Sequence, residues 1–506
     1  MLTRLKISGF KNLVDVDVRF GPFTCIAGAN GAGKSNLFDA IMFLGALADN
    51  PLMDAAKSVR DEGGRASDVR NLFHRVGETY ADRMTFEAEM IVPERGIDDL
   101  GQEAKAKITF LRYSLTLGFR ADTASRFGGL ELLYEELSHI NLGTAPQNIL
   151  FPHKAAAWRY SAVKGRRSGG AFISTQGEGK ERIIELHTDG EGGGRPRLIL
   201  SANLPRTVLS TVNTAENPTA LMAKREMQSW RRLRLEPSAL RKPDELSAPT
   251  ILGEDGSHLA ATLYNLARRG NIIESEAAGS DAANPRRSTV YDRLTGRLAE
   301  FKADAGEITV ANDEKRDLLT VMLTKADGTQ HPARALSDGT LRFLAIALLE
   351  LDRESPGMIC LEEPENGIHP DRIRLLTDLL QEIAVDVCEP VSTGNPLRQV
   401  VVNTHSPAVI ARIPDESLLV AGLAETVKNG LSFESARFSC LTNTWRHIPD
   451  ENTYVVDREC ISAYPDSMPQ QLPEQKYQEK QKKAFRDSHQ NDETCHQMQP
   501  SLPYGE

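Results

Sequence analysis

The stretch "GANGAGKS" at residues 28–35 has the residue types and the spacing that bind phosphate. It fits the pattern GxxxxGK[ST], which occurs once in the chain. Glycines let backbone N–H groups converge on a phosphate without side-chain clash, and the N-terminus of a following helix adds a favourable dipole. Lys34 would reach the β- and γ-phosphates of a nucleotide, and the Ser35 hydroxyl would ligate Mg²⁺.

Two adjacent carboxylates, Glu362 and Glu363, end the apolar run "MICLEE". Unpaired buried carboxylates are unfavourable, so a pair at the end of a strand indicates a ligand that attracts negative charge. In the Walker B arrangement the first acid lies near Mg²⁺ and the second polarises the attacking water. Glu362 stands where most such strands carry aspartate, and its extra methylene favours contact with the metal through a water. Glu363 is the candidate general base; two solvated acids at a strand end are the alternative.

Two shorter motifs complete the set of candidate residues. "ALSDGTLRF" at residues 335–343 places Ser337 and Gly339 at the start of a predicted helix, whose N–H groups could meet a γ-phosphate. An ordinary helix cap explains the same residues when the motif is taken alone. His405 follows the buried run "VVVNT", and a single histidine at such a position is more often structural than functional.

The elements that must position these residues alternate between strand and helix. "FTCIAG" reads as a buried strand before the phosphate loop, and "NLFDAIMFLGALA" reads as a helix after it. From about residue 316 the alternation returns, with strands expected at 318–325, 357–363 and 399–407 and helices at 337–351 and 369–384.

The predicted fold class is therefore α/β, with one nucleotide-binding fold split by a large α+β insertion. We expect residues 1–50 to form its N-terminal half, residues 51–314 the insertion of mixed strands and helices, and residues 315–425 its C-terminal half. Residues 426–506 form an extension that turns polar and glutamine-rich, and from about residue 460 this tail is expected to be disordered.

Taken in this order, the four motifs resemble those of the ABC-class ATPases of the RecF/OLD (overcoming-lysogenisation-defect) group. "LTRLKISGFKNL", "EEPENGIHP", "THSP" and "DGSHLAATLYNL" carry the same likeness. The resemblance implies an ABC-type P-loop ATPase head that uses ATP and Mg²⁺ and forms a homodimer or a higher homo-oligomer. In this group Ser337 and Gly339 would be the signature that closes over ATP held by a second copy, and His405 would sense the γ-phosphate.

The resemblance also assigns roles residue by residue. Glu363 and His405 would be catalytic, and Ser35 and Glu362 would hold the metal. Asn366 and Gly367 would form a loop between protomers, and no residue is assigned to the glutamine that ABC ATPases carry in their Q-loop. The nucleotide-binding residues would be Lys11, Asn12, Asn30, Gly31, Gly33, Lys34, Ser35, Asn36, Ser337 and Gly339.

One departure from the OLD group matters for function. OLD-type nucleases continue after the histidine motif into a Toprim domain, whereas the roughly 100 residues here leave no room for its acid clusters. We therefore expect no intrinsic nuclease activity. The chain is similar to the stand-alone ATPases of the Septu and PARIS anti-phage systems, in which a separate HNH or Toprim nuclease is the effector.

The composition and the basic stretches bear on where the protein acts and on which partners it binds. The apolar runs are shorter than the roughly 20 residues that span a bilayer, the N-terminus does not read as a secretory signal, and Cys25 and Cys360 read as reduced core residues. We therefore expect a cytoplasmic protein with no membrane partner. The net charge of −10 argues against a surface that binds nucleic acid everywhere, but a local basic face is compatible with it. Arginines in "SWRRLRLEPSALRKP" and "VKGRRSGG" could contact DNA, although the first stretch also reads as an amphipathic edge strand. The alternative function is a DNA-repair clamp of the RecF or chromosome-maintenance kind, and a transporter's ATPase subunit is disfavoured by the RecF/OLD elements.

Overall fold

The computed structural model describes most of the 506-residue chain. The described residues are 1–59, 68–120, 129–189, 194–278, 289–302, 306–353, 357–428, 430–448 and 453–462. The polar tail expected to be disordered from about residue 460 falls almost wholly outside them. No helix among these residues is long and apolar enough to cross a membrane.

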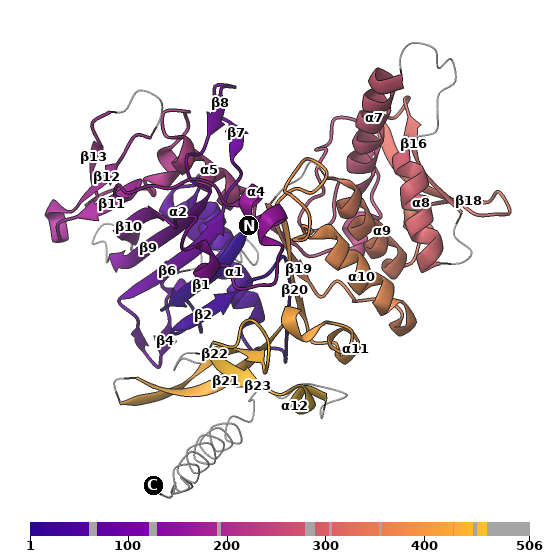
Figure 1. The fold of residues 1–506 in the computed structure, drawn as a ribbon. Coiled ribbons are helices and arrows are strands. Elements are labelled where there is room, and N and C mark those ends of the chain that lie inside the picture. The colour runs from indigo at the N-terminus through magenta and orange to yellow at the C-terminus, as the bar shows by residue number, and fades with distance from the viewer. Residues whose placement is uncertain are drawn as a thin grey trace, which may run out of the picture.

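A seven-stranded sheet forms the centre of the molecule (Figure 1). Its order is β14 (Arg231–Leu233), β19 (Gly357–Glu362), β20 (Arg398–Thr404), β3 (Phe23–Gly28), β21 (Leu418–Lys428), β22 (Leu431–Leu441) and β23 (Tyr454–Val456). The first five strands run parallel, so their carboxyl ends meet at one edge. Such an edge is the usual ligand-binding edge of an α/β sheet.

The central strands β3, β19 and β20 are buried along almost their whole length because both faces of the sheet are covered. In β19, Met358 and Cys360 belong to a buried cluster with Phe43 on one face of the sheet, whereas Ile359 and Leu361 belong to a cluster with Phe343 on the other. This is the continuous apolar pattern of a parallel strand buried on both sides. It explains why the apolar runs in the sequence predicted buried strands correctly.

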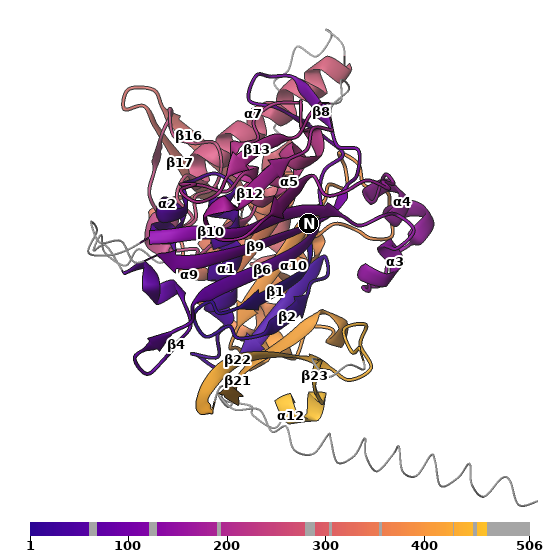
Figure 2. The ribbon, with the colours of Figure 1, turned by 90° about the vertical axis from the view of Figure 1, so that its left-hand side faces the viewer.

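A second, eight-stranded antiparallel sheet lies on one side of the central sheet (Figures 1 and 2). Its order is β13 (Arg197–Leu200), β12 (Ile183–Leu186), β11 (Ile173–Gln176), β10 (Gly129–His139), β9 (Phe110–Arg120), β6 (Arg83–Ile91), β1 (Leu2–Ser8) and β2 (Val16–Arg19). Helix α1 (Lys34–Leu47) packs between the two sheets, because its buried side chains share one cluster with residues of both. Helices α2 (Leu52–Ser58) and α5 (Pro218–Gln228) adjoin α1.

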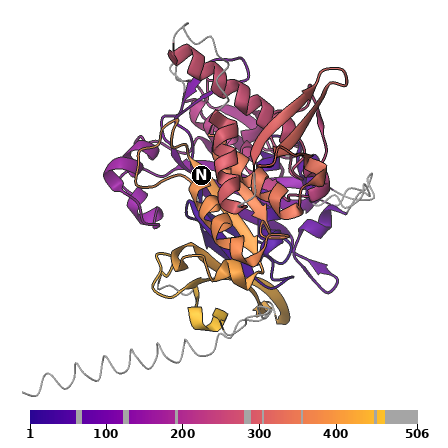
Figure 3. The same cartoon turned by 90° about the vertical axis from the view of Figure 1, so that its right-hand side faces the viewer.

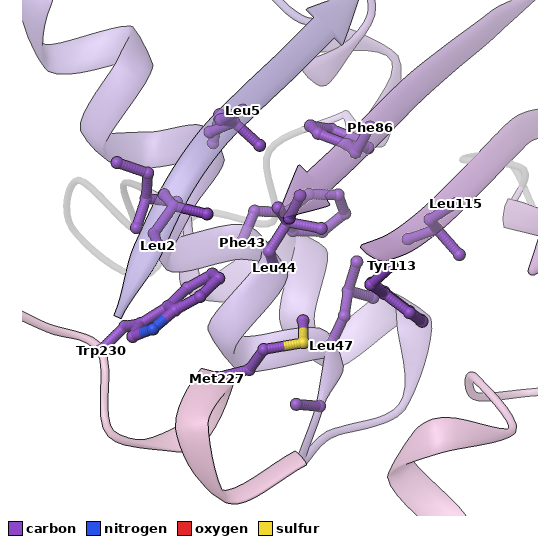
Figure 4. Close-up of a cluster of buried hydrophobic side chains, with 14 of the residues drawn as sticks. Leu2, Leu5, Phe43, Leu44, Leu47, Phe86, Tyr113, Leu115, Met227 and Trp230 are labelled. Carbon is purple, nitrogen blue, oxygen red and sulfur yellow. The ribbon is translucent and has the colours of Figure 1, made fainter. Parts of the chain in front are cut away.

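Large side chains fill the space between α1 and the eight-stranded sheet (Figure 4). Phe43 of α1 lies 5.9 Å from Phe86 of β6 and 5.8 Å from Phe10, measured between ring centroids. Trp230 closes the cluster at its edge and donates its indole N–H to Glu226 at 3.0 Å. Aromatic pairs at these separations add to the stabilisation from burial, so α1 is held firmly behind the phosphate loop.

Helices cover the other face of the central sheet (Figures 1 and 3). They are α7 (Leu259–Ala278), α8 (Thr289–Phe301), α9 (Asp338–Leu351) and α10 (Ile373–Ile383), with a small sheet of β15 (Asp244–Glu245), β17 (Leu318–Thr324), β16 (Glu307–Asp313) and β18 (Gln330–Pro332). The shortest helices are α3 (Ala145–Asn148), α4 (Tyr160–Ala162), α6 (Pro237–Leu240), α11 (Pro407–Ile410) and α12 (Arg458–Ser462). Two hairpins, β4 (Arg75–Val76) with β5 (Thr79–Tyr80) and β7 (Arg95–Ile97) with β8 (Glu103–Lys105), stand apart from the main sheets.

The structure distributes some predicted segments differently from the sequence analysis. Strand β14 lies within the stretch 51–314 assigned to the insertion, yet it pairs with β19 in the central sheet. Conversely, β1 and β2 lie in the stretch 1–50 assigned to the ATPase half, yet they pair within the eight-stranded sheet. Which sheet a strand joins depends on long-range pairing, which the pattern of neighbouring residues does not determine.

The β21–β22 hairpin supports the phosphate loop from behind. A Cβ atom at Gly28 would lie 2.3 Å from the carbonyl oxygen of Ala421 in β21, and one at Gly33 would lie 2.5 Å from the Cβ of Ala436 in β22. The N–H of Ala436 also donates to the carbonyl of Asn12 at 2.9 Å. The hairpin therefore packs directly on the loop that the sequence predicts to bind phosphate.

We expect Gly28→Ala to destabilise the protein by about 3 kcal/mol, because the new methyl group would overlap the β21 backbone. Thermal unfolding followed by circular dichroism measures this loss. Gly143→Ala is the matched control, since a Cβ at Gly143 would meet nothing within 4 Å. Equal unfolding temperatures for the two variants would contradict the close packing of hairpin and loop.

Candidate nucleotide site

The phosphate loop joins the carboxyl end of β3 to the N-terminus of α1. Gly31 and Gly33 adopt φ values of 84° and 93°, a left-handed conformation that side chains rarely tolerate. Helix α1 begins at Lys34 with no side-chain cap at its N-terminus. The first N–H groups of the helix are thus available to a ligand, and together with the helix dipole they favour an anion.

Lys34 is held over this loop in a buried position, with 5% of its surface exposed. Its Nζ donates to the carbonyl oxygens of Gly28 at 2.6 Å and Ala29 at 2.8 Å. Burial lowers the pKa of the amine, and the nearby carboxylates of Glu363 and Glu365 only partly oppose this. Phosphate oxygens would stabilise the charged amine, so the site is electrostatically prepared for an anionic ligand.

Glu363 lies opposite the loop with its carboxylate fixed on both sides. Its Oε1 lies 2.8 Å from His405 Nδ1, and its Oε2 accepts a hydrogen bond from the Asn366 side chain at 2.8 Å. Its own N–H donates to Asn403, and its φ of 44° is unusual for a residue with a side chain. This geometry aims the carboxylate in one direction.

The pKa of Glu363 lies below its ordinary value. Burial raises it, but the hydrogen bonds from Asn366 and His405 and the charge of Lys34 outweigh the effect of burial. The carboxylate is therefore ionised at neutral pH and can accept a proton from a water molecule. The sequence analysis predicted this chemistry for Glu363.

One cavity of about 240 Å³ brings the central candidates together. It is lined by Asn30, Gly31, Gly33, Lys34, Ser35, Asn36, Glu362, Glu363 and Asn403. The Ser35 hydroxyl and the Glu362 carboxylate are hard oxygen donors of the kind that Mg²⁺ prefers. The described residues contain no cluster of three or more metal-ligating His, Cys, Asp or Glu side chains, so a metal here would need phosphate or water oxygens as well.

Lys11 and Asn12 adjoin the phosphate loop without lining that cavity. Lys11 Nζ lies 2.7 Å from Asp39 Oδ2, and the Asn12 side chain accepts a hydrogen bond from Asn36 Nδ2 at 2.7 Å. His74 Nδ1 lies 2.7 Å from the carbonyl of Lys11, which itself has a φ of 49°. The structure therefore places both residues next to the loop, as expected from the resemblance, but with protein partners.

Ser337 and Gly339 stand at the start of α9 and do not line the cavity. Ser337 caps the helix, since its Oγ accepts from the Thr340 N–H at 3.4 Å. Gly339 is packed closely, because a Cβ there would lie 2.4 Å from the carbonyl oxygen of Gly367. Within one chain, the signature motif therefore contacts the turn after Glu363 rather than the phosphate loop.

The sequence analysis missed four residues of this region. Asn403 lines the cavity, and Asp39 and Arg232 form an ion pair behind it. Glu365 is 6% exposed and accepts a hydrogen bond from the Thr404 hydroxyl, and burial raises its pKa. A signal was present only for Asn403 and Glu365, which lie within two residues of His405 and Glu363.

The basic stretches are engaged within the protein. Arg231–Leu233 form the edge strand β14, which agrees with the edge-strand alternative. Lys164 lies 3.2 Å from Glu94, and the Arg167 guanidinium stacks 4.3 Å from the centroid of the Phe172 ring.

Two family models match the chain in the parts that build this site. Residues 203–411 match a family described as "AAA domain, putative AbiEii toxin, Type IV TA system", and residues 4–93 match one described as "AAA domain". The two matched parts therefore assign an AAA ATPase domain to this chain. The two matches meet in space at the cavity, because one contains the phosphate loop and the other contains Glu362, Glu363 and Asn403.

A short segment of this ATPase is similar to a DNA replication and repair protein. The DNA replication and repair protein RecF of Phocaeicola vulgatus is 38% identical over 66 residues, which are 12% of this chain and 17% of RecF. The match thus spans less than a fifth of that relative's length. It supports a RecF-like ATPase segment.

Solved structures of SMC heads align over most of this ATPase. The SMC head bound to the C-winged helix domain of ScpA aligns with 15% identity and a TM-score of 0.41, covering 86% of this chain and 98% of that one. The head with an extended coiled coil bound to the C-terminal domain of ScpA, derived from Pyrococcus furiosus, gives 14% and 0.38, covering 86% and 96%. The head from Thermotoga maritima gives 14% and 0.34, covering 86% and 97%. Because these TM-scores are low, the α/β fold of this chain is assigned from the strand order of its central sheet and from its phosphate loop.

Proposed function

We propose that this ATPase is a molecular switch that binds ATP with Mg²⁺, dimerises around it, and controls a separate effector nuclease of the HNH or Toprim type in anti-phage defence. The observation that carries the nucleotide part is the single cavity that joins the phosphate loop to the acid pair. The role in defence rests on the resemblance to the Septu and PARIS ATPases.

The cavity supports hydrolysis as well as binding. Lys34, the N–H groups at the start of α1 and Ser35 would hold the phosphates and the metal, and Mg²⁺ would neutralise the charge that develops on them. Glu363 would take a proton from the attacking water, and Asn366 and His405 would keep its carboxylate aimed.

The signature motif supports the dimer. Ser337 and Gly339 lie at the N-terminus of a 14-residue helix, yet they do not line the cavity of their own chain. A second copy could place this helix end over the γ-phosphate, where its N–H groups and dipole would favour the negative charge. ATP would then join two chains, and hydrolysis would release them.

A DNA-repair clamp is the second candidate, favoured by the RecF similarity over 66 residues. It would bind DNA directly and would need no effector.

Native mass measurement of the protein, expressed with its genomic neighbours, tests the proposal. With ATP we expect a dimer or higher oligomer that carries a stoichiometric second polypeptide. Lys34→Ala should show no ATP-dependent change, because it removes the amine that would meet the phosphates, whereas the exposed Lys57→Ala should behave as the parent. A homodimer that carries DNA and no other protein would favour the repair clamp.

A further inference from the structure

An ion-pair network lies directly behind the acid pair. Asp39 of α1 has a fully buried side chain, and each of its oxygens meets a cation from a different part of the chain. Oδ2 lies 2.7 Å from Lys11 Nζ, and Oδ1 lies 2.9 Å from Arg232 Nη1 of the edge strand β14. A buried carboxylate requires such compensation, so Asp39 anchors both cations beside the phosphate loop.

The same nitrogen of Arg232 faces Glu362. Arg232 Nη1 lies 3.9 Å from Glu362 Oε1, and the two side chains are only 22% and 16% exposed. Strand pairing fixes this approach, because Arg232 is in register with Cys360, two residues before Glu362. One guanidinium nitrogen thus stands between two carboxylates, one of which lines the cavity.

We propose that Arg232 is a positioning residue that sets the metal affinity of the site, because its guanidinium competes with a divalent cation for Glu362. This inference rests on the proposed nucleotide site. Without metal, Arg232 compensates the charge of Glu362 and reduces the repulsion between the carboxylates of Glu362 and Asp39. When the metal is bound, two cations would face one carboxylate, and Asp39 would hold the guanidinium back by its shorter contact.

Mn²⁺ binding followed by electron paramagnetic resonance, with ADP present so that no turnover occurs, tests this competition. We expect Arg232→Gln to bind Mn²⁺ about tenfold more tightly than the parent, because a positive charge beside the ligand is gone. Arg232→Lys keeps the charge and should keep the parent affinity. Arg234→Gln is the matched control, since Arg234 lies on the same segment but is 74% exposed and pairs with Glu236.

A second variant distinguishes loss of folding from loss of the competition between Arg232 and the metal for Glu362. Arg232→Gln leaves Asp39 with one cation fewer, whereas Asp39→Asn combined with Arg232→Gln removes both charges and should also bind Mn²⁺ more tightly. Unchanged or weaker Mn²⁺ binding in the folded double variant would overturn the inference. If the parent with ADP bound no Mn²⁺ at all, the proposed nucleotide site itself would fail instead.

Discussion

Glu363→Gln should lower the rate of ATP hydrolysis by about a hundredfold or more while ATP binding is kept, as expected for loss of a general base. The amide can still hold the contacts to Asn366 and His405, so the shape of the cavity should persist. It cannot take a proton from water. Phosphate release at saturating ATP, together with fluorescent-nucleotide binding, measures the two properties separately.

The trapped state of this variant gives a second readout. With ATP bound and hydrolysis blocked, we expect a stable dimer on size-exclusion chromatography, which the parent would populate only briefly. Glu78→Gln is the matched control because its carboxylate is 98% exposed. Parent-like turnover in Glu363→Gln would show that another group activates the water.

Mixing two inactive variants should restore activity if the signature serves a second copy. Lys34→Ala would lose the phosphate contact, and Ser337→Asp would keep the helix cap but place a negative charge where the γ-phosphate would lie. In a one-to-one mixture, half of the dimers would carry one working site, so about a quarter of the parent activity should return. The ATPase rate as a function of the mixing ratio measures this recovery.

The recovery must depend on which two variants are mixed. A mixture of Lys34→Ala with Glu363→Gln should stay inactive, because each change disables the cavity of its own chain. In the mixed dimer, one site would lack the phosphate contact of Lys34 and the other would lack the base Glu363. Failure of the first mixture, with both variants folded, would mean that α9 does not act across a dimer.

The features of this protein that depend only on residues close together in the chain could be predicted from the sequence. The phosphate loop follows from glycines at fixed spacing between a buried strand and a helix, and the structure shows that strand, those left-handed glycines and α1. The cap at Ser337 and the acids at the end of β19 are equally local. Periodicity over a few residues was sufficient for each of them.

Only the tertiary structure decided which distant residues share the site. Asp39 meets Lys11 across 28 positions and Arg232 across 193, and neither pair leaves a pattern in the sequence. The sequence also did not show that the β21–β22 hairpin packs on the phosphate loop, because the pattern of a strand does not determine which sheet edge it joins. Parallel pairing of β14 with β19 brings Arg232 to Glu362. These residues could not be predicted to lie together, because the order of strands in a sheet depends on burial of the whole core and not on neighbouring residues.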